Sequence, residues 1–281
     1  MNKHLLVAVS DAFTSSLSLR FVYEFFSNRK DLELTLYYVI PKKDPDGFSL
    51  ASLPGAKRKA SLDPDAIPAM EQARHWLLDM GFPGENIHAK VLPADLGVVK
   101  DIIRESEEGL YDAAVLGRRG LSWFEEVFSY SVTHRILWES ITFPIWVCRN
   151  PDHGRKDVLV CVDGSEGCAR VADHVGFMLR DEPGHRVTLL NVGCGEDSGD
   201  ADIFKEPMRM LLDNGFPRNR VDSRCIPKGS PVKAILAESK NYAAVAIGRS
   251  AGRPTAFGQI FGSTSLKILR SMEGAALWLC K

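Results

Sequence analysis

The apolar stretch Tyr242–Gly248 reads YAAVAIG, and a close copy of it, YDAAVLG, stands 131 positions earlier at Tyr111–Gly117. Three further pairs of short sequences recur in the same order along the chain. These pairs are Leu5–Ser10 with Val158–Asp163, Leu78–Pro83 with Leu212–Pro217, and Ile145–Arg149 with Leu277–Lys281. Because ordered self-similarity is the signature of a repeat, the sequence predicts two tandem copies of one domain.

The two predicted domains occupy residues 1–150 and 155–281, with the polar, turn-rich stretch 150–154 between them. The spacing between matching sequences falls from 153 positions in the opening strand to 134 positions at the Gly-Phe-Pro turn. The first copy therefore carries roughly 19 extra residues, and we expect them in the Pro- and Lys-rich stretch Pro41–Pro68. A loop of that length often has a function of its own.

Short apolar runs alternate with helical stretches in both copies. The expected strands are 5–9, 33–40, 88–92, 113–116, 144–147, 158–162, 186–192, 221–226, 243–247 and 277–281. The expected helices are 15–26, 67–80, 96–106, 131–139, 167–179, 203–214, 231–239 and 263–271. Continuous apolar strands are typical of parallel sheets that are buried on both faces. The alternation therefore predicts an α/β fold with two open, doubly wound parallel sheets.

Composition argues against several classes of protein. The 281 residues carry a formal net charge of −1, so no general attraction to nucleic acid or to anionic membranes is expected. No apolar stretch approaches the ~18 residues of a membrane-spanning helix, and the apolar run near Met1 is too short for a secretion signal. We therefore expect a cytoplasmic protein with neither nucleic-acid nor membrane partners.

Cysteine and histidine spacing gives no sign of a metal site. The six cysteines include no C-x-x-C pair, and the seven histidines show no metal-ligand spacing. We expect neither a disulfide framework nor a structural metal. Cys148, Cys161 and Cys280 lie in apolar strand-like runs, and we interpret them as small buried apolar residues.

A glycine-rich segment follows the expected strand 243–247. The residues of interest in it are Gly248, Arg249, Gly252, Gly262, Ser263 and Thr264. Glycines let the backbone approach a ligand closely, and the helix that begins at Ser263 offers N–H groups to an anion. Arg249 is placed to add a charge-assisted contact. Asp163, after strand 158–162, is placed to accept a hydrogen bond from a ribose hydroxyl, so the sequence predicts a nucleotide site.

This combination resembles the ATP-binding members of the universal stress protein family, in their tandem form with two domains in one chain. Their pattern is glycine, two residues, glycine, nine residues, glycine and serine or threonine, with an aspartate ending the first strand. The second copy departs from it once, because Ala251 places three residues between Gly248 and Gly252. The resemblance covers nearly the whole chain twice, and it implies that Val192 and Ile247 contact the adenine.

The resemblance also implies a function and an assembly. It implies a stress-response protein that holds ATP, with Mg2+ as an accompanying ion, as a sensor or stabilising ligand. No general base is evident, so we expect no enzyme beyond slow ATP hydrolysis. Pairing through the last strands, where Trp146 and Trp278 hold equivalent places, is a further implication. We expect the domains to pack face to face as an intrachain pseudo-dimer, and the chain is a candidate for homodimer formation.

The first copy has lost parts of the same pattern. Gly117 and Gly120 keep the two-residue gap, but Tyr130 stands where the third glycine is expected. Ser10 replaces the strand-end aspartate. Because a tyrosine side chain would intrude where phosphates approach the backbone, we expect nucleotide to bind mainly in the second domain.

The sequence lacks motifs that are typical of other nucleotide-binding folds. No G-x-x-x-x-G-K-[ST] occurs, and no G-x-G-x-x-G follows the first strand, which disfavours P-loop NTPases and NAD-binding folds. The glycines can also serve tight turns only, and Asp163 can cap a turn. Two alternatives therefore stay open: a scaffold with vestigial glycine loops, and a lipid or small-ligand binder that uses the remodelled first domain.

Overall fold

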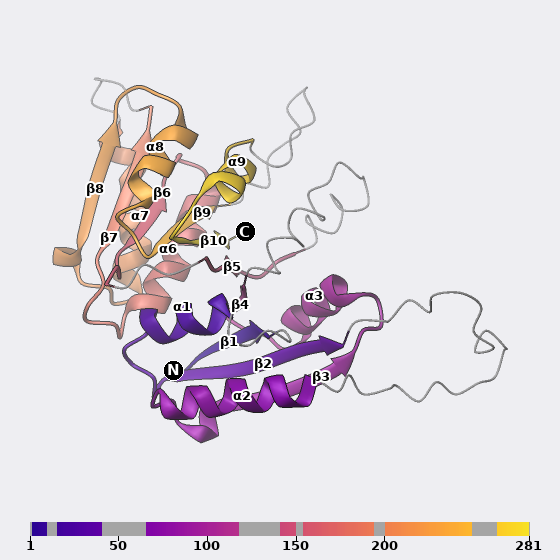
Figure 1. Cartoon of the computed structure of the whole chain (residues 1–281). Helices are drawn as coiled ribbons and strands as arrows, with labels where there is room; N and C mark the ends of the chain where they lie inside the picture. Colours follow the sequence, from indigo (N-terminus) through magenta and orange to yellow (C-terminus); the bar gives the residue numbers. More distant parts are fainter. Residues whose placement is uncertain are drawn as a thin grey trace, which may run out of the picture.

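In the computed structural model, the described residues are 2–9, 16–40, 66–117, 141–149, 154–193, 200–248 and 263–280. We call residues 2–149 the N-terminal half and residues 154–280 the C-terminal half (Figure 1).

Each half supplies five strands. They are β1 (Lys3–Ala8), β2 (Leu32–Ile40), β3 (Ile87–Pro93), β4 (Ala113–Leu116) and β5 (Ile145–Val147), then β6 (Val158–Cys161), β7 (Val187–Val192), β8 (Val221–Ile226), β9 (Ala244–Gly248) and β10 (Ala276–Cys280). The α-helices are α1 (Leu17–Phe25), α2 (Ala66–Asp79), α3 (Val98–Glu108), α6 (Glu166–Leu179), α7 (Lys205–Asp213), α8 (Pro231–Ser239) and α9 (Ser263–Ser271). Short 3-10 turns are η3 (Gly84–Asn86), η4 (Asp200–Phe204) and η5 (Arg218–Arg220).

The expected strands and helices in the described ranges are confirmed to within two residues at each end. The expected helix 131–139 lies outside the described residues. One boundary needs correction, because α2 begins at Ala66, inside the expected insertion Pro41–Pro68. Pro68 fits there because the N–H groups of a helix's first turn have no partner within the helix, so proline removes no hydrogen bond.

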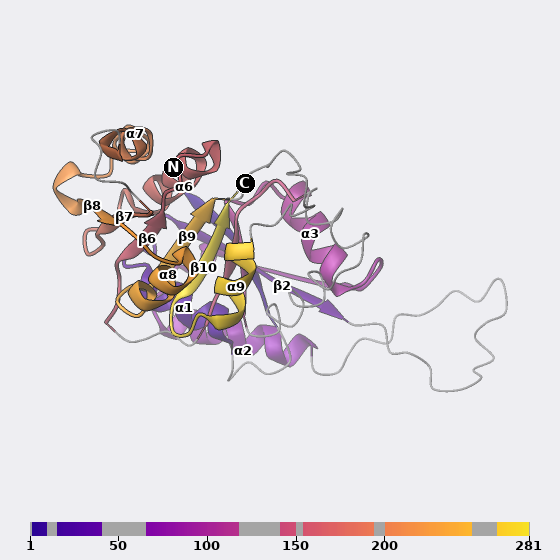
Figure 2. The ribbon, with the colours of Figure 1, turned by 90° about the horizontal axis from the view of Figure 1, so that it is seen from above.

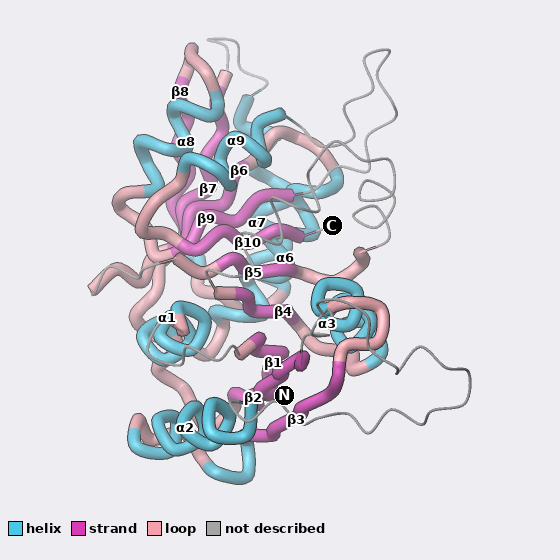
Figure 3. The backbone as a smooth tube through the Cα atoms, turned by 45° about the vertical axis from the view of Figure 1, so that its right-hand side comes forward, coloured by secondary structure: helices cyan, strands magenta, loops and turns pink. Residues whose placement is uncertain are grey.

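All ten strands form one sheet in the order β3-β2-β1-β4-β5-β10-β9-β6-β7-β8. Figure 3 shows this sheet running without a break from β8 to β3. Neighbouring strands within each half are parallel, and β5 pairs antiparallel with β10. We call the β5–β10 pair the junction. Read outward from it, the strands of the two halves follow the same order, β5-β4-β1-β2-β3 and β10-β9-β6-β7-β8.

Helices cover both faces of the sheet, which confirms the doubly wound α/β class. Buried side chains of α1, α2, α6 and α7 share one core cluster, and those of α3, α8 and α9 pack against the opposite face. Figure 2 shows α6 and α7 on one side of β6 and β9, with α8 and α9 on the other. The first of these clusters contains residues of both halves.

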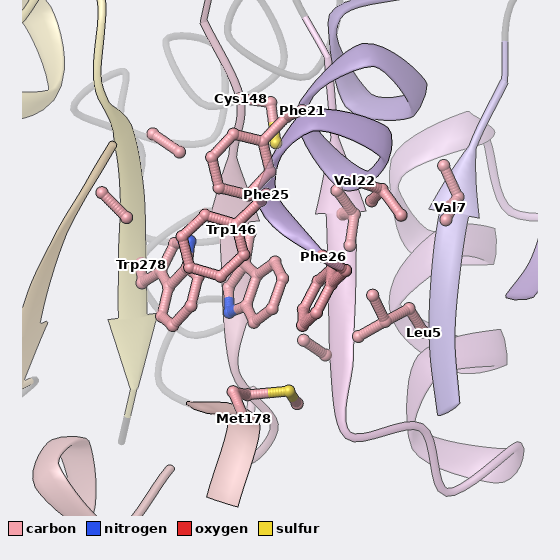
Figure 4. Close-up of a cluster of buried hydrophobic side chains, with 14 of the residues drawn as sticks. Leu5, Val7, Phe21, Val22, Phe25, Phe26, Trp146, Cys148, Met178 and Trp278 are labelled. Carbon is pink, nitrogen blue, oxygen red and sulfur yellow. The ribbon is translucent and has the colours of Figure 1, made fainter. Parts of the chain in front are cut away.

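The two halves meet edge to edge, so the expectation that they pack face to face is wrong. Trp146 of β5 is in register with Trp278 of β10, and their indole rings stack at 3.9 Å with an interplanar angle of 2°. Figure 4 shows the pair side by side, next to Phe21 and Phe25 of α1. Both last strands would otherwise end a sheet with unpaired N–H and C=O groups. Pairing them satisfies these groups and buries both indoles completely.

The junction departs from its internal symmetry at one position. His174 of α6 accepts a hydrogen bond from the indole N–H of Trp146 at 3.0 Å. Phe21 of α1 occupies the equivalent position, 153 residues earlier, and its ring offers no such acceptor. The indole N–H of Trp278 accordingly has no hydrogen-bond partner among the described residues. One half of the junction is therefore polar at this position and the other is fully apolar.

A second set of contacts joins the halves at the amino ends of the strands. Lys3 is buried, and its Nζ lies 3.3 Å from Oδ2 of Asp181. Lys156, the equivalent residue of the C-terminal half, reaches back to the hydroxyl of Ser27 at 3.5 Å. In each half, a lysine near the start of the first strand therefore contacts a loop of the other half.

Glu182 provides the most buried of these contacts. Its carboxylate is fully buried and accepts hydrogen bonds from the backbone N–H groups of Ser27 at 2.8 Å and Asn28 at 3.1 Å. We expect Glu182→Ala to lower the free energy of unfolding by about 3 kcal/mol, because two backbone N–H groups at the contact between the halves lose their carboxylate acceptor. Urea denaturation measures this loss.

The matched control for this change is Glu166→Ala. Among the described residues, the one ion pair of Glu166 is an exposed contact with Arg170 at 3.6 Å, so we expect its loss to cost at most about 0.5 kcal/mol. Glu182→Gln keeps an acceptor oxygen and should fall between the two. Equal stabilities for the two alanine variants would contradict the role assigned to Glu182.

Candidate nucleotide site

Three predicted site residues lie at the carboxyl ends of neighbouring strands. β6 pairs in parallel with β7 on one side and with β9 on the other. Cys161 is in register with both Leu190 and Ile247, so Asp163, Val192 and Gly248 follow at nearly the same level. The parallel sheet therefore brings these three residues to one edge, where open α/β sheets bind their ligands.

The carboxylate of Asp163 is held in place by its own loop. Its Oδ1 accepts hydrogen bonds from the N–H of Ser165 at 3.0 Å and from the thiol of Cys168 at 2.8 Å. Gly164 makes the turn between them with a φ of +77°, a conformation that favours glycine.

The charge state of Asp163 follows from these contacts. Partial burial alone would raise the pKa of Asp163, but hydrogen bonds from Cys168 and Ser165 outweigh it and lower the pKa below its usual range. Burial and the Asp163 carboxylate both raise the pKa of the Cys168 thiol, so this thiol stays protonated and continues to donate. The result at neutral pH is an ionised, oriented acceptor at the edge of the sheet.

Gly248 is required by the packing of the chain itself. A Cβ at this position would lie 2.6 Å from the carbonyl carbon and 2.7 Å from the carbonyl oxygen of Gly167. The end of β9 therefore touches the backbone of the first turn of α6. Gly117, the equivalent residue of the N-terminal half, has more room, because a Cβ there would lie 3.5 Å from the nearest atom, the N of Ser18.

The two residues expected to contact adenine differ in exposure. Ile247 is only 8% exposed and belongs to the core under α8 and α9. Val192 is half-buried and packs at the margin of the same core. Of the two side chains, Val192 is therefore the one more open to a ligand at this edge.

The remaining predicted site residues are placed only in part. Ser263 and Thr264 begin α9, as expected, and the backbone N–H groups of its first turn have no partner within the helix. Arg249, Gly252 and Gly262 lie outside the described residues, and so do Ser10, Gly120 and Tyr130 of the N-terminal half. Their assigned roles stay predictions.

Two residues of this region were missed by the sequence analysis. Cys168 orients Asp163, and Asn191 donates from its buried side-chain amide to the carbonyl of Val162 at 2.7 Å. The five-residue spacing from Asp163 to Cys168 was a usable signal, because a side chain one turn into a helix faces the residue before its start. The role of Asn191 depends on strand register and has no local signal.

The described residues contain no group of three or more side chains suited to hold a metal ion. In the same part of the chain, no helix is both long and apolar enough to cross a membrane. Cys148 and Cys280 are buried, which confirms their interpretation as buried residues, and Cys161 is half-buried. Cys225 is disulfide-bonded, a bond that the cysteine spacing did not predict.

Comparison with known proteins identifies the architecture. No protein-family model and no curated protein matches the sequence. Among solved structures, a universal stress protein from Archaeoglobus fulgidus superposes with a TM-score of 0.58 at 22% identity, over 99% of this chain and 96% of the other. The chain has the universal stress protein fold. A functionally unknown protein from Pseudomonas aeruginosa has the same fold, with a TM-score of 0.60 at 12% identity, over 100% of this chain and 92% of the other.

Both matches run across the N-terminal and the C-terminal halves. The universal stress protein fold in this chain thus includes the ten-stranded sheet and its central junction. At these identities the likeness concerns the fold, and the chemistry of the site depends on the residues described above.

Proposed function

We propose that this chain is a tandem universal stress protein that binds ATP in its C-terminal domain, residues 155–281, as a sensor or stabilising ligand in the cytoplasm. The observation that carries the proposal is the convergence of Asp163, Val192 and Gly248 at one carboxyl edge of the sheet. The ionised carboxylate of Asp163 suits a ribose hydroxyl, and the start of α9 suits a phosphate group.

Mg2+ would enter this site with the nucleotide. Among the described residues there is no cluster of metal ligands, so the phosphates of ATP and water would supply most of the coordination. The chain's own contribution would be to bind and orient the nucleotide. We propose that the protein is not an enzyme, with ATP hydrolysis at most slow.

A scaffold without nucleotide is the second candidate, and one observation favours it. The contact between Gly248 and Gly167 explains this glycine without any ligand. The hydrogen bonds at Oδ1 of Asp163 likewise complete a local turn. In a scaffold, these residues would be kept for the packing of α6 against β9.

The test combines analysis of copurified nucleotide with titration of ATP. The purified protein is denatured, its supernatant is analysed for adenine nucleotides, and ATP binding is measured for wild type, Asp163→Asn and Gly262→Val. We expect both substitutions to weaken ATP binding by at least ~10-fold, the loss of about 1.4 kcal/mol, because one removes the ribose acceptor and the other blocks close phosphate approach.

Gly120→Val is the matched control, because it alters the glycine loop of the N-terminal half. We expect it to leave ATP affinity unchanged. If wild type shows neither copurified nucleotide nor ATP affinity, the scaffold is the better function. If ATP binds equally well to all variants, nucleotide binding stands but the residues assigned to the site are wrong.

A further inference from the structure

Two buried histidines lie where the halves of this protein meet. His174 of α6 lies against the stacked indoles of the junction, with ring centroids 5.7 Å from Trp146 and 5.9 Å from Trp278. Its Nε2 accepts the indole N–H of Trp146, so this nitrogen carries no proton in the closed junction. A proton on Nε2 would remove the acceptor and place a charge among aromatic rings.

His185 lies at the other contact between the halves, in the turn from α6 to β7. It is fully buried, and its ring packs at 4.5 Å against Phe25 of α1 in the N-terminal half. Neither ring nitrogen has a hydrogen-bond partner among the described residues. The backbone of Phe25 favours the protonated ring, but no carboxylate of the described residues does, so protonation would create a buried charge that its surroundings stabilise poorly.

The charged groups around His185 also disfavour its protonation. Lys3 of β1, Lys156 ahead of β6 and Arg220 of η5 all act on it with positive charge. The nearby carboxylates are already engaged, since Asp181 pairs with Lys3 and Glu182 accepts the N–H groups of Ser27 and Asn28. The cluster thus has cations to repel a proton on His185 and no free carboxylate to stabilise it.

These surroundings set the direction of both titrations. Burial lowers the pKa of His174 to about 3, and no charged group contributes to the shift. Burial, followed by the charge of Lys156, lowers the pKa of His185 to about 4, and the backbone of Phe25 offsets this only in part. Both histidines are thus neutral in the closed junction and would regain an ordinary pKa near 6.5 once exposed.

We propose that the junction is an acid-sensitive latch: proton uptake by His174 and His185 separates the two halves, while each half keeps its own strands and helices. β5 stays paired with β4, and β10 stays paired with β9. Separation breaks the antiparallel pair, the core shared around the stacked indoles, and the contacts of Asp181 and Glu182 with the N-terminal half. Both histidines sit on the turn-and-helix unit formed by α6 and residues 180–186, and both contact the N-terminal half. This unit therefore carries both histidines and the contact that each of them makes with the N-terminal half.

The pH dependence of the closing equilibrium follows from the difference in histidine pKa between the closed and the separated halves. A histidine with a depressed pKa stabilises the closed form above pH 6.5, and that stabilisation is lost as the pH falls toward the depressed value. Between pH 7.5 and pH 5, the equilibrium constant for closing should fall about 30-fold for each histidine. The two together should lower it roughly 1000-fold.

The stacked indoles allow the closed state of the junction to be detected by spectroscopy. Because the two ring centroids lie only 3.9 Å apart, we expect the indoles to couple their electronic transitions and the closed junction to give an exciton couplet in circular dichroism. We expect this couplet to disappear in wild type as the pH falls toward 5, ahead of the far-ultraviolet signal of helices. Amide hydrogen exchange, corrected for intrinsic rates, should rise at the same pH in β5 and β10 but not in β1, β2, β6 and β7.

Variants separate the latch from general acid unfolding. His174→Phe reproduces the apolar half of the junction, where Phe21 already occupies the equivalent position, and His185→Phe sacrifices no hydrogen bond among the described residues. We expect the double variant to retain the couplet at pH 5. His75→Phe, which changes an exposed histidine of α2, should behave as wild type.

Two results would overturn the proposal. One is loss of the couplet and of the helical signal in a single transition at the same pH. The other is an unchanged midpoint in the double variant. If the double variant does not fold, amide exchange in wild type decides alone, because uniform acceleration across all strands would also contradict a latch at the junction.

Discussion

Gly248→Ala is expected to lower the free energy of unfolding by about 3 kcal/mol, several times the cost of the equivalent change Gly117→Ala. The added Cβ at residue 248 would meet backbone atoms of Gly167 at 2.6 and 2.7 Å, and backbone atoms have no rotamer by which to move away. The start of α6 must therefore shift away from β9. Because that turn also carries Cys168, the orientation of Asp163 should be lost with it.

Gly117→Ala is the internal control for this change. The nearest atom to a Cβ at residue 117 is 3.5 Å away, which is an ordinary van der Waals distance, so we expect a cost below about 1 kcal/mol. Urea denaturation of both variants gives the comparison. Similar losses in the two, or a small loss at residue 248, would mean that β9 and α6 do not approach as closely as described.

Trp146→Ala is expected to cost about 4 kcal/mol, because it removes a fully buried indole, its stacking on Trp278 and its hydrogen bond to His174. Trp76→Ala removes the same side chain from a half-buried site, where the ring contacts Tyr23 at 5.4 Å. We expect about half the loss there, since less surface was buried.

The two tryptophan variants should also differ in how the molecule unfolds. Trp146 contacts both halves, so its loss should weaken the coupling between them, and the halves should then unfold at different urea concentrations. Trp76→Ala should retain a single transition. A single, only slightly shifted transition for Trp146→Ala would contradict the central role of the indole stack.

Much of the fold could be predicted because its signals are local. The apolar runs that became β4 and β9 read as buried parallel strands without any knowledge of their neighbours. The geometry of the junction has no such signal. An apolar last strand fits a face-to-face contact as well as an edge-to-edge one. Only the register of Trp146 with Trp278 shows which of the two the chain adopts.

The site residues also differ in whether a local sequence signal could identify them. Asp163 could be identified because it follows an apolar strand directly, and its place in the chain reveals its place at the sheet edge. The close contact of Gly248 with Gly167 joins residues 81 positions apart and depends on how α6 crosses β9. A glycine needed for packing and a glycine needed for a ligand look the same in sequence.

The continuous sheet has a consequence for solubility. Two separate five-stranded sheets would each expose two edges, and every exposed edge can pair with another chain and start aggregation. Joining β5 to β10 hides two of these edges, so the described sheet leaves only β3 and β8 open. Both carry charged or ionisable side chains, among them His88 and Lys90 on β3 and Asp222 and Arg224 on β8, which discourage further strand addition.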